Sequence, residues 1–315
     1  MKKHNIIILA LYIIAVSTFL SACNSANKQT GDTTDSVEIT HKLGKTPIKK
    51  LPTRIVTLDI GALETLTALG VTPVGVPKKY MPEYLDGLKN NADVADVGSV
   101  IEPDFEAINA VSPDLILMST RQERFYEELS HIAPTIFIGT DNKNYLPSFK
   151  ENTMLLASIV NKEDEANEKL QALEAKIKSA QERFEQDSSK ALFLIYNNGK
   201  FSAFGQGSRF GFIHDVLHIK PVMELQDESV HGQKVSNELI AEANPDYLFI
   251  VDRNAAVVGK KANLSEVENP LVKQTNAYKN QKIFYLDPNL WFISGGGLTS
   301  VDLMVDDIVK KLEAK

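Results

Sequence analysis

The sequence predicts an α/β fold made of two similar lobes, each with a parallel central sheet, joined by a single long helix. The segments Glu106 to Arg121 and Glu238 to Arg253 align without a gap and share Glu, Ile, Pro, Asp and Arg. Each copy reads as a helical turn led by an acid, a Pro-Asp turn and an apolar strand that ends at an arginine. Between the copies, residues 146–186 lack glycine and have proline only at position 147. A unit built twice, with a long helix between, predicts two lobes and a cleft.

The first lobe alternates apolar strand segments with helical ones. Gly70 ends the first expected helix, and a strand follows at once. Alternation of strand and helix is typical of a parallel sheet. Strands are expected at 54–59, 71–76, 95–98, 115–118 and 135–139, with helices at 62–69, 105–110 and 122–132.

The central segment and the second lobe are predicted in the same way. Residues 146–186 are dense in Ala, Glu, Lys and Leu, which favours helix, with a break expected near 161–164. An Asn-Asn-Gly turn at 197–199 separates two strands. In addition to the second copy of the repeat, the second lobe is expected to contain strands at 191–196, 200–204 and 282–286 and helices at 210–218 and 299–312.

The N-terminus predicts secretion and lipidation. Lys2 and Lys3 precede an apolar run at 6–19 that is too short to cross a bilayer as a mature helix, as in a signal peptide. Leu-Ser-Ala-Cys at 20–23 resembles the lipobox of bacterial lipoproteins, in which the cysteine is lipidated. The expected organisation is 1–22 signal peptide, 23–40 lipidated N-terminus and flexible tether, 41–146 N-terminal lobe, 147–187 bridging helix region and 188–315 C-terminal lobe.

Composition and missing motifs restrict the function classes. Cys23 is the only cysteine, so disulfides and thiolate metal clusters are excluded. The formal charge of −7 becomes −9 without Lys2 and Lys3, which argues against a nucleic-acid partner and leaves anion binding to locally placed arginines. No G-x-S-x-G, H-E-x-x-H, C-x-x-C or Gly-rich dinucleotide fingerprint occurs, so we do not expect an enzyme. Two function classes remain, a binding protein and a lipid-anchored enzyme. An enzyme would alter its ligand chemically, whereas a binding protein returns it unchanged.

The chain resembles the lipoprotein substrate-binding proteins of iron-siderophore ABC importers, in the branch for catecholate and petrobactin-like ferric complexes. That resemblance implies two Rossmann-like lobes joined by one rigid helix, and a monomer without a cofactor. It also implies a lipid-anchored protein on the extracytoplasmic face of the cell membrane, of Gram-positive type, that delivers a ferric siderophore to permease subunits and their ATPase. The lipobox, the two repeats and the segments 119–126, 204–211, 230–235, 251–254 and 285–291 carry the resemblance.

Three arginines are the candidate ligand-binding residues. Arg121 and Arg253 follow the strands of the two repeats. Because ligands of open α/β sheets bind at the carboxyl ends of the strands, we expect these two to face each other across the cleft. Arg209, in a turn-rich loop, would add a third guanidinium group suited to the oxygens of an anionic iron(III) complex. The alternative role for all three is structural ion pairing, and Arg124 is expected to face solvent.

The resemblance adds His231, Trp291 and Phe292 to the candidate site. It implies that His231 can fill an open iron(III) coordination position when the siderophore supplies only four oxygens. The tyrosine expected after the tryptophan is Phe292 here, which has no oxygen, so ligands that saturate the metal themselves are favoured. Trp291 and Phe292 would offer ring faces to catechols, with core packing as the alternative. Tyr285 would replace the missing oxygen only if it reached the cleft.

Two acids and several alternatives complete the sequence predictions. Glu106 and Glu238 lead the two repeats, where a carboxylate also suits a helix dipole; the resemblance implies that they dock onto the permease.

The alternative function is a haem- or cobalamin-binding lipoprotein of an ABC importer, with His231 as an axial haem ligand. His214 and His218, four apart on an expected helix, would share a face suited to zinc but lack a third ligand.

Overall fold

The computed structural model describes residues 36–225 and 231–313. The chain divides into the units Met1–Ser36 and Val37–Lys315, and the second unit contains a five-stranded and a six-stranded sheet. In the five-stranded sheet, which the first half of the unit forms, every neighbouring pair of strands is parallel, as the sequence predicted. Its strands lie in the order β5 (Ala95–Asp96), β4 (Gly75–Val76), β3 (Ile55–Thr57), β6 (Leu115–Met118) and β7 (Thr135–Phe137).

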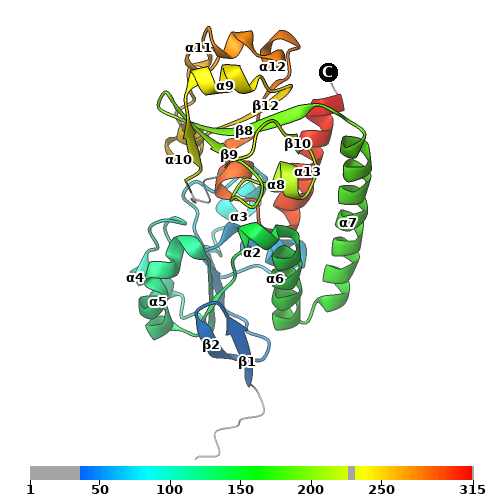
Figure 1. The fold of residues 1–315 in the computed structure, drawn as a ribbon. Helices are drawn as coiled ribbons and strands as arrows, with labels where there is room; N and C mark the ends of the chain where they lie inside the picture. Colours follow the sequence, from blue (N-terminus) through cyan, green and yellow to red (C-terminus); the bar gives the residue numbers. More distant parts are fainter. Residues whose placement is uncertain (1–35, 226–230, 314–315) are drawn as a thin grey trace, which may run out of the picture. The chain divides into compact units, whose positions relative to one another are not determined.

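Helices cover both faces of this sheet because its strands are apolar on both sides. Along β6, Leu115 and Leu117 pack towards α2 (Ile60–Ala68) and α6 (Tyr145–Val160). The alternate residues Ile116 and Met118 pack towards the other face, which is covered by α4 (Phe105–Ala110) and α5 (Tyr126–Ile132). Figure 1 shows these two helix layers on opposite sides of the lower sheet.

The second sheet is mixed. Its centre is parallel: β12 (Tyr247–Asp252) lies between β8 (Lys190–Asn197) and β13 (Ile283–Tyr285). The strand β9 (Lys200–Phe204) pairs antiparallel with β8, and β11 (Gln233–Val235) pairs antiparallel with β9. The two-residue turn Asn198-Gly199 has φ of 50° and 77° and joins β8 to β9 as a hairpin, and so short a connection allows only antiparallel pairing. The parallel prediction therefore holds for the centre of the sheet and not for its hairpin edge.

The long helix α7 (Glu163–Glu185) connects the two halves. It follows α6 after a break at Asn161, whose φ of 56° is left-handed, so the range 147–187 contains two helices, broken where the sequence predicted. The apolar side of α7 includes Leu170 and Ile177, which belong to the main core. The last helix, α13 (Leu298–Glu313), packs against both α2 and α7 and so returns the chain to the first sheet (Figure 1).

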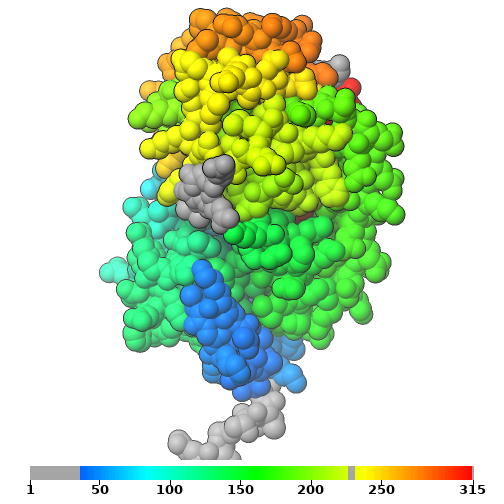
Figure 2. Space-filling view, in the orientation of Figure 1, coloured from blue at the N-terminus to red at the C-terminus, as the bar shows by residue number. Residues whose placement is uncertain are grey.

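A hairpin, β1 (Ser36–His41) and β2 (Gly44–Lys49), precedes the first sheet. The range 23–40, expected as a tether, therefore ends in a strand from Ser36 on, and that part of the prediction was wrong. Ile39 and Ile48 are buried in the core with Ile55, which explains why this polar-looking segment is ordered. The hairpin, blue in Figure 2, lies at the surface.

Short elements complete the described chain. The helix expected at 210–218 is limited to four residues, and that expected at 122–132 begins as a 3-10 helix. Within the described residues no helix is long and apolar enough to cross a membrane. The remaining elements are η1 (Glu83–Leu85), α3 (Asp86–Lys89), η2 (Thr120–Phe125), η3 (Asn142–Asn144), α8 (Phe212–Asp215), β10 (Lys220–Pro221), α9 (Asn237–Ala243), α10 (Arg253–Val258), α11 (Leu264–Val267), η4 (Val272–Gln274), α12 (Asn276–Lys279) and the π-helix η5 (Asn289–Ile293).

Candidate functional site

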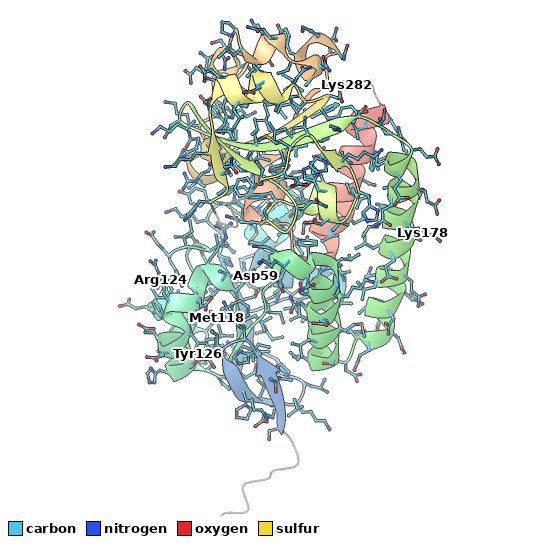
Figure 3. The ribbon with its side chains drawn as sticks, in the orientation of Figure 1. Asp59, Met118, Arg124, Tyr126, Lys178 and Lys282 are labelled. Atoms are coloured by element: carbon cyan, nitrogen blue, oxygen red, sulfur yellow. The ribbon has the colours of Figure 1, made fainter. Side chains whose placement is uncertain are left out.

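A cavity of about 300 Å³ lies where the two halves meet. Its N-terminal wall comes from residues that follow parallel strands: Asp59 after β3, Arg121 after β6 and Thr140 after β7. The carboxyl ends of parallel strands meet at one edge of a sheet, which is where open α/β sheets bind ligands. Asp59 lies between the two halves in Figure 3. The opposite wall is formed by second-half residues, among them Arg209, Phe210, His231, Trp291 and Ser294.

The three predicted arginines gather around one residue, Phe292. The guanidinium carbons of Arg121, Arg209 and Arg253 lie 5.6, 4.8 and 5.8 Å from the centre of its ring. The Phe292 carbonyl also accepts hydrogen bonds from Nη2 of Arg121 at 2.7 Å and Nη2 of Arg209 at 3.0 Å. Arg121 and Arg209 line the cavity. Arg253 and Phe292 are not among its lining residues, and Arg253 joins the cluster through its contact with the Phe292 ring.

The cluster gathers three guanidinium groups with a single nearby carboxyl, that of Asp59, among the groups that shift their pKa values. None of the three arginines forms an ion pair with a carboxylate within residues 36–225 and 231–313. Burial, together with repulsion from Arg121 and Arg253, lowers the pKa of Arg209 to about 9. Burial also lowers the pKa of Arg121, while nearby Asp59 opposes that shift and Arg253 adds to it. An anion in the cavity would relieve the repulsion among these groups.

Asp59 is the acidic counterpart that sequence reasoning missed. Burial raises the pKa of Asp59, and hydrogen bonds from Ser119 and the Ala62 N–H, with the charge of Arg121, act against that shift. Its side chain also caps α2, accepting from the Ala62 N–H at 2.8 Å. The feature of the sequence that could have identified Asp59 is its position just after the first strand, which places it at the same edge of the sheet as Arg121.

Local hydrogen bonds fix the backbone that carries each arginine. Arg121 lies in η2, where Gln122 accepts from the Ser119 N–H at 3.0 Å and donates to the Leu58 carbonyl at 3.2 Å. Arg253 is the first residue of α10, and Asp252 caps that helix by accepting from the Asn254 N–H at 2.9 Å.

The loop that carries Arg209 is held by Asp215, whose carboxylate accepts from the Gly207 N–H at 2.8 Å. All three guanidinium groups are therefore presented from ordered segments, which lowers the entropic cost of binding.

The aromatic pair has different surroundings. Trp291 lines the cavity, packs in the main core near Phe193 and Phe212, and donates from Nε1 to Asp307 at 3.0 Å. Phe292 is buried, and its ring stacks on Phe210 at 6.0 Å while facing the guanidinium groups. The structure thus gives both residues a core-packing role and places Phe292 beneath the arginines.

His231 is exposed and lines the cavity, beside the undescribed residues 226–230. Tyr285 donates to Glu268 at 2.9 Å and packs in a separate core cluster. Arg124 is exposed, as expected, with its guanidinium 4.4 Å from the Phe125 ring centre, and it points away from the cleft in Figure 3.

The zinc alternative for His214 and His218 is wrong. The helix α8 ends at Asp215, and His218 has a left-handed φ of 59°, so the two imidazoles do not share a helical face. His214 is buried, and its Nδ1 lies 2.7 Å from the Ile219 carbonyl oxygen. Nδ1 of His218 lies 2.8 Å from Oε1 of Glu185. The described residues contain no cluster of three or more His, Cys, Asp or Glu side chains suited to a metal ion.

The two predicted docking acids lie on equivalent elements. Glu106 is in the first turn of α4 and Glu238 in the first turn of α9, and both are exposed. Asp104 and Ser236 cap these helices, so neither glutamate is needed as the capping residue. Cys23 lies outside the described residues.

A buried carboxyl beside the cavity was also missed. Glu64 of α2 accepts hydrogen bonds from the Tyr84 hydroxyl at 2.5 Å, the Ser300 N–H at 2.9 Å and the Ser294 hydroxyl. These contacts fix the segment that follows Phe292 against α2. Burial raises the pKa of Glu64 to about 7, and the hydrogen bonds of Ser294, Ser300 and Tyr84 oppose that shift.

Known proteins match the chain over most of its length. The family model described as periplasmic binding protein matches residues 55–290. The chain is 40% identical to the petrobactin-binding protein YclQ of Bacillus subtilis, covering 99% of this chain and 100% of that protein. The crystal structure of YclQ superposes with a TM-score of 0.86 over 89% of this chain and 99% of that one.

Two further proteins show the same likeness. Ferric-anguibactin-binding protein FatB of Vibrio anguillarum is 38% identical over 87% of both chains. The iron uptake substrate-binding protein PiuA of Streptococcus pneumoniae is 41% identical, covering 88% of this chain and 99% of that one, with a TM-score of 0.83.

Proposed function

We propose that this chain, which belongs to the periplasmic binding protein family, binds a ferric siderophore in the cavity between its two halves. The observation that carries the proposal is the cluster of three arginines at Phe292, none of them ion-paired within the described residues. A ferric complex of catecholate or hydroxycarboxylate groups is anionic, and planar guanidinium groups donate well to such oxygens. The net charge of the chain is negative, so this attraction is local.

The ligand class is a catecholate or petrobactin-like complex. The relatives named for petrobactin and ferric anguibactin support this class. Phe292 stands where the resemblance expects a tyrosine, and it offers no oxygen to iron. We therefore infer a preference for ligands that saturate the metal themselves, with His231 as the side chain that would complete an unsaturated complex.

The protein would act as the lipid-anchored capture component of an ABC importer and not as an enzyme. The lipobox-like residues before Cys23 support an anchor on the extracytoplasmic face of the cell membrane. Glu106 and Glu238, exposed at the start of equivalent helices, support docking to two permease subunits powered by an ATPase. The long helix α7 limits motion between the halves, so closure on binding should be small.

Quenching of Trp291 fluorescence tests the ligand class. Trp291 is the only tryptophan and lines the cavity, so a bound iron complex should quench it. We expect saturable quenching by ferric catecholate and petrobactin-like complexes and none by ferric hydroxamates. Quenching by haem alone would instead favour the haem-binding alternative, with His231 as axial ligand.

A further inference from the structure

A second chamber of about 750 Å³ adjoins the arginine-lined cavity. Residues after β7 and on α6 line both spaces, so the two share a wall there. Its lining includes His41 and Lys42 of the N-terminal hairpin region, and Gly207 of the Arg209 loop contributes from the other half. The first cavity alone is at the lower limit of ligand-pocket volumes, about 300 Å³.

The part of the wall that the two chambers share carries uncharged hydrogen-bonding side chains. Thr120, Thr140, Asn142 and Asn152 line both spaces, and each is exposed or partly buried. None of these four side chains forms a hydrogen bond with another residue in the described part of the chain. An asparagine amide offers two N–H donors and one carbonyl acceptor, and a threonine hydroxyl offers both functions. These groups are therefore available to a ligand that passes from one chamber into the other.

The segment that carries three of these side chains, those of Thr140, Asn142 and Asn152, is ordered. Ser148 of α6 accepts from the Asp141 N–H at 2.8 Å, which fixes the turn before the helix. The Tyr145 hydroxyl donates to the Gly295 carbonyl at 2.6 Å and ties the same helix to the second half. The backbone that carries Asn142 and Asn152 is thus fixed before any ligand arrives, which reduces the entropic cost of hydrogen-bonding one.

The second chamber also differs from the first in charge. Its carboxylates, Asp141 and Glu151, balance its ammonium groups, Lys42 and Lys143. Lys42 is paired with Glu123 at 2.8 Å, and Asp141 accepts from the Lys143 N–H at 3.0 Å. Burial lowers the pKa of His41, which keeps its imidazole neutral near pH 7. The chamber therefore lacks the excess positive charge that the arginines give the first.

We propose that the second chamber holds a neutral, amide- or hydroxyl-bearing arm of the ligand, hydrogen-bonded by Thr140, Asn142 and Asn152. The anionic iron-bearing part then occupies the arginine-lined chamber. This inference rests on the proposed function, because it assumes that the iron complex is the ligand. It assigns selection among ferric complexes to uncharged side chains outside the arginine cluster.

Two ferric probes with the same metal-binding groups test the assignment. One is iron(III) with separate catechol molecules, and the other is iron(III) with a linear tris-catecholate whose rings are joined through an amide-bearing polyamine chain. The double variant Asn142→Ala/Asn152→Ala should bind the linked complex about ten- to a hundredfold more weakly, from two or three lost hydrogen bonds. Its loss of affinity for the unlinked complex should be at least about fivefold smaller, since that complex has no arm and can meet these side chains only from the first cavity.

Two further variants control for damage to the fold. Ser158→Ala changes an exposed residue of the same helix that lines neither chamber, and it should bind both complexes as wild type does. Asn152→Leu keeps the branched shape without the hydrogen-bonding groups and should also weaken the linked complex more than the unlinked one. Equal losses for both probes, or no loss for either, would overturn the inference while leaving the proposed function intact. Failure of the wild-type protein to bind either probe would overturn the proposed function and this inference with it.

Discussion

Nη2 of Arg121 donates a hydrogen bond of 2.7 Å to the carbonyl of Phe292, a contact between the first half of the chain and the segment before its last helix. The same carbonyl accepts from Arg209, so two guanidinium groups from opposite walls are oriented by one backbone oxygen. Each arginine keeps further N–H donors for a ligand. The contact therefore aligns the site and links its two walls.

Arg121→Ala and Arg253→Ala should each weaken binding of an anionic ferric complex by about 1.5–3 kcal/mol, or about ten- to a hundredfold, through the loss of charged hydrogen bonds. Titration of intrinsic fluorescence measures the change. Arg124→Ala is the matched control, because Arg124 lies in the same segment but faces solvent. Wild-type affinity in both Arg121→Ala and Arg253→Ala would refute the charge argument.

Glu64 should make the protein less stable as the pH rises. Between pH 4.5, the ordinary pKa, and about 7, the native carboxyl keeps a proton that the unfolded chain has released. The free energy of unfolding should therefore fall across this window, by about 3 kcal/mol at most. Denaturant titrations at several pH values measure it. Glu64→Gln removes the titration and should flatten this part of the profile, and an unchanged slope in the variant would assign it to other groups.

Gly61→Ala should destabilise the protein although alanine normally favours a helix. A Cβ at Gly61 would lie 2.6 Å from the backbone carbon of Gly296, so α2 and the segment before α13 must separate. We expect a loss of about 1–3 kcal/mol, seen as a lower melting temperature. Gly87→Ala is the control, because it lies in α3 with nothing within 4 Å of the added Cβ, and it should be neutral or stabilising. A melting temperature for Gly61→Ala equal to that of wild type would mean that the two segments do not pack this closely.

Glu106→Arg and Glu238→Arg should abolish delivery of the ligand while leaving its binding unchanged. Both side chains are exposed at the start of their helices, away from the cavity residues, so only contact with a partner should suffer. Uptake of radioactive iron in cells, beside a binding titration, separates the two effects. Glu242→Arg, also exposed on α9, is the control. Normal uptake in both variants would exclude these acids as docking residues.

The lobes were predictable because their signal is local and repeated. In each copy of the repeat an apolar strand is followed by an arginine, Arg121 or Arg253, so the sequence marks where these strands end. In open α/β sheets the ligand-binding cleft forms at the carboxyl ends of the strands. The hairpin β1–β2 was missed because only two of its apolar side chains, Ile39 and Ile48, enter the core. The antiparallel edge of the second sheet follows from the turn at Asn198, whose Asn-Gly sequence was read as a turn without its consequence for strand direction.

The site was predictable only in part. Arginines at strand ends are visible in the sequence, but their convergence on Phe292 depends on the return of the chain to the first half. Glu64 bonds to Ser294 and Ser300, more than two hundred residues later, and no periodicity encodes such a contact. Asn142 and Asn152 carry no motif, and they become notable only once two chambers are seen to share them.

The central claim is that the arginine cluster binds an anionic ferric complex. Calorimetric titration of wild type and of Arg121→Gln/Arg209→Gln/Arg253→Gln with a hexadentate ferric tris-catecholate tests it most directly, with Arg124→Gln as the control. We predict that the triple variant binds at least about a hundredfold more weakly, while the control matches wild type. Equal affinity of the triple variant and wild type would contradict the claim.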